Sequence, residues 1–128
     1  MMKTLSILIA CCALGLASGF GVRYLTQPSA PTLAERTGDY AHIQQREQAD
    51  VVLYSLPGCD ACKRARTWLQ DNNIAFAELD IAASEAARAE SRSLGAKTVP
   101  LILIRTRSVE GFDPARWHQL LQTRRPLS

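Results

Sequence analysis

The sequence predicts an α/β domain in which a mixed β-sheet is flanked by helices, with the elements in the order β-α-β-α-β-β-α. Three observations predict it. Short apolar runs rich in β-formers alternate with amphipathic stretches from Val51 onward. Pro and Gly residues separate many of these segments. The chain has 128 residues, of which 47% are hydrophobic, which is enough for one core but not two. Strands that alternate with helices indicate parallel pairs joined by crossover helices.

The first half of this domain contains two predicted strands and the helix between them. Residues 51–56 are a short apolar run that Pro57-Gly58 interrupts, which is typical of a buried strand. Residues 59–72 have an apolar face at helical spacing, and the pair Asn72-Asn73 ends the helix. Residues 75–80 alternate between apolar and polar, which predicts the second strand.

The second half adds two helices and two strands. An Ala-rich helix is predicted over 83–94, with Gly95 at the C-terminal cap. Residues 100–104 are a continuous apolar strand, buried on both faces, and residues 105–110 can turn back as a short edge strand. Asp113 caps the last helix, which Pro114 begins. We therefore expect a four-stranded mixed sheet, and a last helix whose inner face carries Trp117, Leu120 and Leu121.

The N-terminus predicts a signal peptide or a membrane anchor over residues 1–25. Residues 5–22 carry no charge and follow Lys3, and 18 residues lie at the lower edge of the about 17–25 that a spanning helix needs. The small residues 17–19 would suit cleavage, so both alternatives stay open. We expect an N-terminal apolar helix that contacts a membrane, and a membrane-anchored or exported domain on the periplasmic, extracytoplasmic face. Cys11 and Cys12 fit this run as small apolar residues.

Residues 26–50 predict a linker. Pro28 and Pro31 are followed by a polar stretch whose few apolar residues make no full stripe, so only a weak helix is expected near 33–48. The folded domain is accordingly expected over 51–128. The net charge of +3 is too small to indicate a nucleic-acid partner. We expect a monomer.

Two cysteines, Cys59 and Cys62, stand at the predicted strand-to-helix turn. The N-terminus of a helix favours a thiolate over a thiol, and the thiolate is the attacking species in disulfide exchange. Cys59 is therefore the predicted nucleophile, and Cys62, one turn on, the resolving thiol. Lys63 should favour the thiolate of Cys59, whereas the carboxylate of Asp60 should disfavour it.

The segment 54–62, which reads YSLPGCDAC, resembles the active-site stretch of glutaredoxins. Thr98-Val99-Pro100 resembles their T-V-P motif, whose proline is cis and faces the active-site cysteine, and Gly111-Phe112 falls where they carry Gly-Gly. The resemblance implies a thioredoxin-like fold, thiol-disulfide exchange with disulfide-bearing protein substrates, roles in cell redox homeostasis and electron transfer, and no cofactor. The substrate-binding residues that it implies are Tyr54, Pro57, Thr98, Val99, Pro100, Gly111 and Phe112.

Two departures from that pattern concern the reductant. Leu56 stands where glutathione-using members commonly have Lys or Arg, and a single Gly111 preceded by Glu110 replaces the Gly-Gly pair. Glu110-Gly111-Phe112 is closer to the Ser-Gly-Phe of the glutaredoxin-like hydrogen donors of ribonucleotide reductase. We therefore expect a reductant of the thioredoxin-reductase type rather than glutathione.

A metal-binding module is the alternative interpretation of the C-x-x-C. A zinc site needs two more Cys or His ligands. Outside the apolar run the only candidates are His42 and His118, which lie far apart in the sequence. Copper-chaperone domains also carry C-x-x-C, but their element order is β-α-β-β-α-β. Glutaredoxin-like iron–sulfur carriers usually rely on glutathione. No metal site is therefore predicted.

Overall fold

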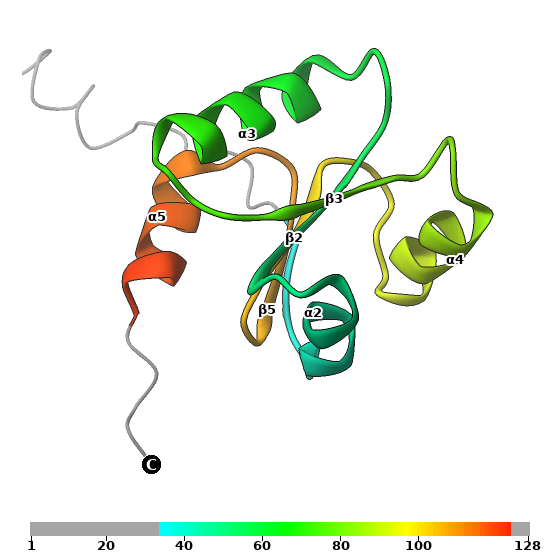
Figure 1. Cartoon of the computed structure of the whole chain (residues 1–128), viewed down its shortest axis with the longest axis horizontal. Helices are drawn as coiled ribbons and strands as arrows, with labels where there is room; N and C mark the ends of the chain where they lie inside the picture. The colour runs from blue at the N-terminus through cyan, green and yellow to red at the C-terminus, as the bar shows by residue number, and fades with distance from the viewer. Residues whose placement is uncertain (1–33, 124–128) are drawn as a thin grey trace, which may run out of the picture. The chain divides into compact units, whose positions relative to one another are not determined.

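The structure, a computed structural model, describes residues 34–123 as a mixed β-sheet with helices on both faces (Figure 1). The predicted apolar helix, with Cys11 and Cys12, lies outside the described residues. Among residues 34–123, no helix is long and apolar enough to cross a bilayer. The elements are β1 (Glu35–Thr37), α2 (Ala41–Glu47), β2 (Val51–Ser55), α3 (Asp60–Asp71), β3 (Ala77–Asp80), α4 (Glu85–Ser93), β4 (Leu101–Ile104), β5 (Arg107–Glu110) and α5 (Pro114–Gln122).

The sheet has the strand order β1-β5-β4-β2-β3. The pair β2–β3 is parallel and α3 crosses between the two strands, whereas β2–β4, β4–β5 and β1–β5 are antiparallel. Leu53 lies opposite Ile102 on β4 and Glu78 on β3, so β2 is an interior strand. From β2 onward the order is the predicted β-α-β-α-β-β-α, which confirms the fold class.

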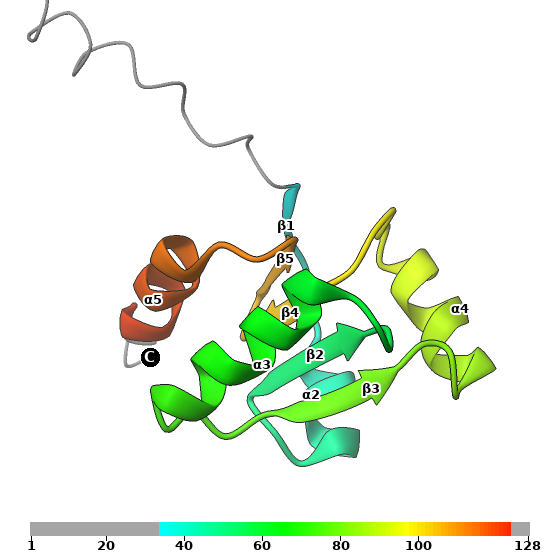
Figure 2. The same ribbon diagram turned by 90° about the horizontal axis from the view of Figure 1, so that it is seen from above.

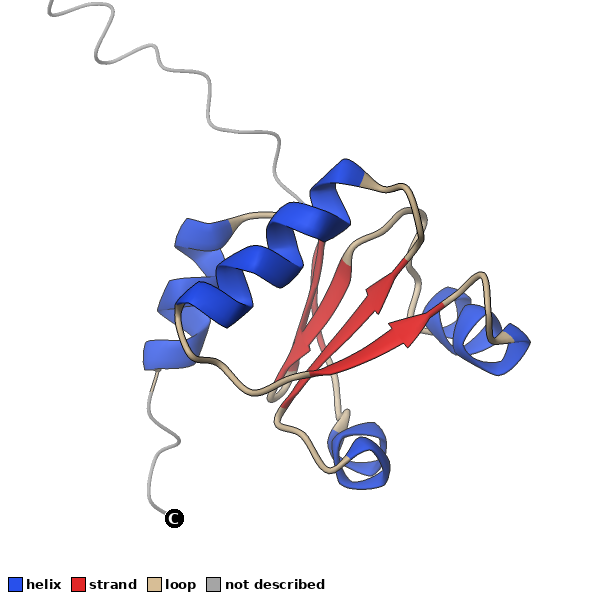
Figure 3. Ribbon diagram, turned by 45° about the horizontal axis from the view of Figure 1, so that its top comes forward, coloured by secondary structure: helices blue, strands red, loops and turns tan. Residues whose placement is uncertain are grey.

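Side chains of the central strands alternate between two apolar cores. Figures 2 and 3 show α3 and α5 on one face of the sheet and α2 and α4 on the other. Leu53 and Ile102 face α3 and α5, while Val52 and Leu103 face the opposite side. This period of two explains why the apolar run in each central strand is continuous, because a strand covered on both faces needs no polar positions.

The last helix begins as its sequence predicts. The Asp113 side chain accepts a hydrogen bond from the Arg116 N–H at 3.0 Å, and Pro114 occupies the first turn. Trp117 and Leu120 are buried, and Leu121 is half-buried against the same core. Trp117 packs edge-on against Trp68 with ring centroids 5.8 Å apart, which fixes α5 against α3.

Two predictions about the sheet and the linker are wrong for residues 34–50. The sheet has five strands rather than four, because β1 pairs antiparallel with β5, which is therefore not an edge strand. The predicted weak helix is present as α2, but it belongs to the domain. Ile43 is fully buried and Tyr40 nearly so, and the Tyr40 hydroxyl donates to Ser108 Oγ at 3.1 Å. A strand of three residues has too little pattern to be detected from sequence, and the exposed pairing groups of β5 determine its place.

Candidate active site

The two cysteines of the C-x-x-C lie where β2 passes into α3. Cys59 is the N-cap of α3, and its sulfur accepts a hydrogen bond from the Cys62 N–H at 3.2 Å. Gly58 makes the preceding turn with φ of +79°, a conformation that residues with a side chain rarely adopt. Both cysteines are free thiols. The predicted placement of Cys59 at the helix N-terminus is confirmed.

The two thiols differ in their exposure. Cys59 is half-buried, whereas Cys62 is only 1% exposed. Burial, together with the side-chain hydrogen bond to Cys59, raises the pKa of Cys62 to about 11. The Cys62 thiol therefore keeps its proton near neutral pH, while the half-buried sulfur of Cys59 remains accessible.

The loop before β4 lies against the first thiol. The Val99–Pro100 peptide bond is cis, as the resemblance implies, and Cys59 Sγ lies 4.0 Å from the Val99 carbonyl oxygen. Pro100 is buried, Val99 is half-buried and Thr98 is exposed. The structure therefore brings Thr98, Val99 and Pro100 together with the C-x-x-C.

Gly111 and Phe112, which directly follow β5, support the Thr98–Pro100 loop. The Gly111 N–H donates to the Pro100 carbonyl oxygen at 2.7 Å, with a φ of +90° at Gly111. The ring of Phe112 packs edge-on against Trp117 at 5.3 Å between centroids, and the guanidinium of Arg64 lies 6.0 Å above it. Gly111 contacts the loop directly, whereas Phe112 joins the loop to the core.

Tyr54 does not lie where a substrate could contact it, so the prediction of a substrate-binding role is wrong. Its side chain is fully buried on the face covered by α2 and α4. Its hydroxyl donates to Glu90 at 2.5 Å, and Glu90 is also paired with Arg46 of α2 at 2.8 Å. Burial and the bond to Glu90 raise the pKa of Tyr54. Tyr54 therefore holds α4 to the sheet.

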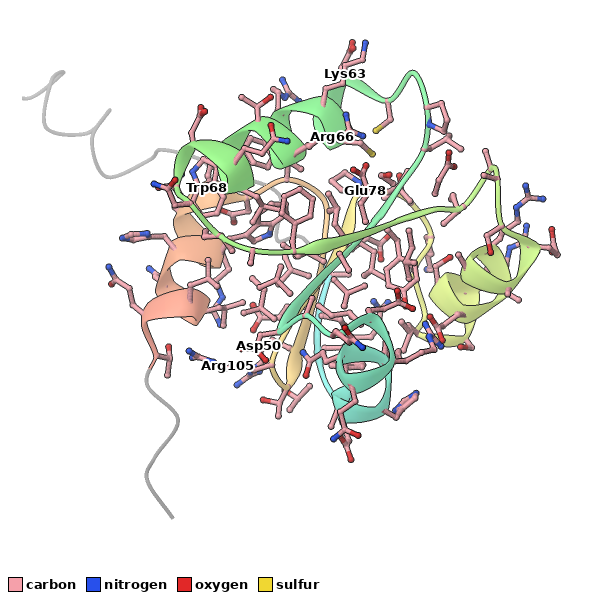
Figure 4. All side chains as sticks on the ribbon, viewed as in Figure 1. Asp50, Lys63, Arg66, Trp68, Glu78 and Arg105 are labelled. Atoms are coloured by element: carbon pink, nitrogen blue, oxygen red, sulfur yellow. The ribbon has the colours of Figure 1, made fainter. Side chains whose placement is uncertain are left out.

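The remaining predicted residues lie on the solvent side of the turn. Pro57 is exposed. Asp60 and Lys63 lie 3.9 Å apart, with side chains that are 90% and 64% exposed, and Lys63 points outward in Figure 4. An exposed pair of this kind is strongly screened by water. Because the two charges are opposite and adjacent, their influences on the neighbouring thiols oppose one another.

An ion pair that the sequence did not indicate lies beside the turn. Arg66 of α3 and Glu78 of β3 point toward each other in Figure 4, with Arg66 Nε 2.8 Å from Glu78 Oε2. The Ser55 hydroxyl donates to Glu78 at 2.6 Å, and the bond from Arg66 lowers the pKa of Glu78. Together with Pro57 and Asp80 these side chains line an open cleft of about 400 Å³. In the described part of the chain, no three His, Cys, Asp or Glu residues cluster closely enough to hold a metal ion.

Comparison with known proteins agrees with this geometry. A glutaredoxin family profile matches residues 51–109. An uncharacterised glutaredoxin-like 8.6 kDa protein in the rubredoxin operon of Clostridium pasteurianum is 33% identical over 73 residues, which are 56% of this chain and 97% of that protein. The crystal structure of the thioredoxin-like protein BC3987 matches with a TM-score of 0.53 and 29% identity, covering 56% of this chain and 99% of that one. The glutaredoxin-like protein NrdH-redoxin from Escherichia coli shares the fold, with a TM-score of 0.52 and 18% identity over 55% of this chain and 92% of that one. The chain therefore belongs to the glutaredoxin family and is a redox protein with a thioredoxin-like fold.

Proposed function

We propose that this chain reduces protein disulfides with the dithiol of Cys59 and Cys62. The observation that carries the proposal is the placement of Cys59: a half-buried sulfur at a helix N-terminus, 4.0 Å from the carbonyl oxygen of Val99. A substrate sulfur that reaches Cys59 must lie beside the loop before β4. A buried second thiol lies one turn further on.

In the first step the Cys59 thiolate attacks one sulfur of the substrate disulfide. A bond forms between Cys59 Sγ and that sulfur, the substrate S–S bond breaks, and the second substrate sulfur leaves as a thiolate that takes up a proton. In the second step Cys62 loses its proton and attacks Cys59 Sγ, which releases the first substrate sulfur as a thiolate and then a thiol. The substrate gains two electrons and two protons, and the chain becomes the Cys59–Cys62 disulfide.

The raised pKa of Cys62 suits this order of events. A thiol with a pKa of about 11 is a poor nucleophile at pH 7, so Cys62 does not compete for the substrate. When Cys59 is in a mixed disulfide it no longer carries a charge that opposes ionisation of Cys62. The Arg66 guanidinium acts in the same direction, because its charge lowers the pKa of Cys62.

We further propose that the reductant is of the thioredoxin-reductase type. Leu56, at the position where glutathione-using relatives commonly carry a basic residue, is 39% exposed and offers no charge to a glutathione carboxylate. The cation in the adjoining cleft, Arg66, is paired with Glu78. A substrate carboxylate entering this cleft would have to displace an existing partner.

Insulin reduction measures this preference. With NADPH and thioredoxin reductase we expect turnover, and with glutathione and glutathione reductase we expect a rate lower by about tenfold or more, as the loss of one charge-assisted contact would produce. The matched variant is Leu56→Arg, which should raise the rate with glutathione and leave the other rate unchanged. Efficient turnover of the unaltered chain with glutathione would contradict the proposal.

We also propose that residues 5–22 bring the redox domain to a membrane, on its outer face. The support is the uncharged run itself, because a charge at the centre of a spanning helix costs about 2.5–3.5 kcal/mol on insertion scales. Leu14→Arg should move the protein from the membrane fraction to the soluble or degraded fraction, while Leu14→Val should not. Fractionation with protease protection measures this. An unaltered chain that is found intact in the cytoplasmic fraction would refute the proposal.

A further inference from the structure

The loop from Lys97 to Pro100 is held at both of its ends by two neighbouring residues, Glu110 and Gly111, at the C-terminal end of β5. Gly111 bonds the Pro100 carbonyl, as described above. At the other end, Oε1 of Glu110 accepts hydrogen bonds from the N–H groups of Lys97 at 3.0 Å and of Thr98 at 2.8 Å. Glu110 ends β5. The part of the loop between these attachments is Val99, whose carbonyl lies against Cys59.

The carboxylate of Glu110 is buried and compensated. Glu110 is 6% exposed, and its second oxygen, Oε2, lies 3.5 Å from Arg36 Nη1 of β1. A buried carboxylate is tolerated when charges and hydrogen-bond donors replace its water. Here two backbone amides bond Oε1, whereas Oε2 faces the Arg36 guanidinium at ion-pair distance and accepts no hydrogen bond from the described residues. The Arg36 side chain passes over Gly95, where a Cβ would lie 3.1 Å from its Nε. The segment before β2 thus contributes directly to the support of the loop.

We propose that Glu110 is a positioning residue for disulfide exchange: it acts through the Lys97–Pro100 loop and holds Val99 beside the thiol of Cys59, where a substrate chain must lie. This inference rests on the proposed reduction of protein disulfides. Glu110 does not touch the reacting sulfurs, so its removal changes how well an extended substrate is bound rather than the sulfur chemistry. A small disulfide, which needs no contact with the loop, is a control for the chemistry alone.

The geometry specifies which substitutions separate this role from a general effect on folding. Both amides bond to the same oxygen, so the side-chain carbonyl of Glu110→Gln can keep both hydrogen bonds. Its NH2 group then faces Arg36 in place of Oε2, so this variant loses the ion pair but keeps the hold on the loop. Glu110→Ala removes the acceptor, and Glu110→Asp withdraws it by one methylene while keeping the charge. The matched control is Glu35→Ala, which removes ion pairs between β1 and Arg107 and Arg116 but leaves the loop untouched.

The experiment is steady-state kinetics of the full chain on insulin and on a small aromatic disulfide. For Glu110→Ala we expect the KM for insulin to rise about tenfold, the loss expected for about one hydrogen bond to a charged group, with kcat within about twofold and the small disulfide unaffected. Glu110→Gln should restore the KM to near the wild-type value, and Glu35→Ala should leave both substrates unchanged. Amide exchange of Lys97 and Thr98 should be faster in the Ala variant than in the Gln variant.

Three outcomes would overturn the role of Glu110: a Glu110→Ala variant that matches the wild type on insulin, an equal loss on both substrates, or a Gln variant as impaired as the Ala variant. If Glu110→Ala does not fold, Glu110→Asp replaces it, with a rise in the KM for insulin expected and an unchanged KM counting against the proposal. A wild-type chain that reduced neither substrate would instead overturn the proposed function, so the two failures are distinguishable.

Discussion

Replacing Cys59 with serine should abolish disulfide reduction by this chain, by about three orders of magnitude or more, because the attacking thiolate is removed and no other described side chain replaces it. Replacing Cys62 with serine should instead trap the substrate on Cys59 as a mixed disulfide, because the resolving step is lost. The difference arises from position: Cys59 is half-buried at the helix N-cap, and Cys62 is 1% exposed behind it.

Mass spectrometry of the trapped adduct and alkylation rates measure this prediction. The background should carry alanine at Cys11 and Cys12, so that only the C-x-x-C is labelled. In the Cys59→Ser variant the contribution of the Cys59 thiol is lost, but burial, the largest cause, still raises the pKa of Cys62. Alkylation should therefore be slow at pH 7 and should accelerate as the pH rises. Rapid labelling of Cys62 at neutral pH, or an adduct on Cys62, would contradict the assignment.

Ile43→Ala should lower the free energy of unfolding by about 2–5 kcal/mol, the range for removing a large aliphatic side chain from a core. Ile43 is fully buried and packs in the cluster that Tyr40, Val52 and Leu103 also form. If residues 34–50 were a linker, as their composition predicts, the same substitution would cost almost nothing. The change in the free energy of unfolding therefore measures how much α2 contributes to the stability of the domain.

Urea-induced unfolding, followed by tryptophan fluorescence, measures this difference. The matched control is Gln45→Ala, an exposed position on the same helix, which should change stability by no more than about 0.5 kcal/mol. An unchanged midpoint for Ile43→Ala would show that α2 adds nothing to the core. A loss of cooperativity, seen as a lower slope, would show instead that α2 unfolds separately from the sheet.

The chemistry-bearing turn could be predicted because its signals are local. The apolar run of β2, the break at Pro57-Gly58 and the spacing of Cys59 and Cys62 all lie within a dozen consecutive residues. The Asp113 cap is of the same kind. Periodicity and capping depend on neighbours along the chain, so the sequence predicts them without any knowledge of the tertiary structure.

The face to which a buried side chain points was not predictable in the same way. Tyr54 belongs to the same sequence stretch as Cys59, but its side chain points to the opposite face of the sheet and bonds Glu90. In a strand buried on both sides, every position is apolar, so the pattern does not reveal which face carries the active site. Only the helices that cover each face distinguish them.

The sequence by itself determined the order of elements from Val51 onward, the C-x-x-C at a helix N-terminus and the loop with its proline. The tertiary structure alone decided that β1 joins β5, that α2 completes a core, and that Glu110 reaches the Lys97 and Thr98 amides. The physical reason is the separation along the chain of the residues that interact. The first set depends on interactions within one or two helical turns, whereas the second joins segments up to about 70 residues apart, whose meeting depends on the whole sheet.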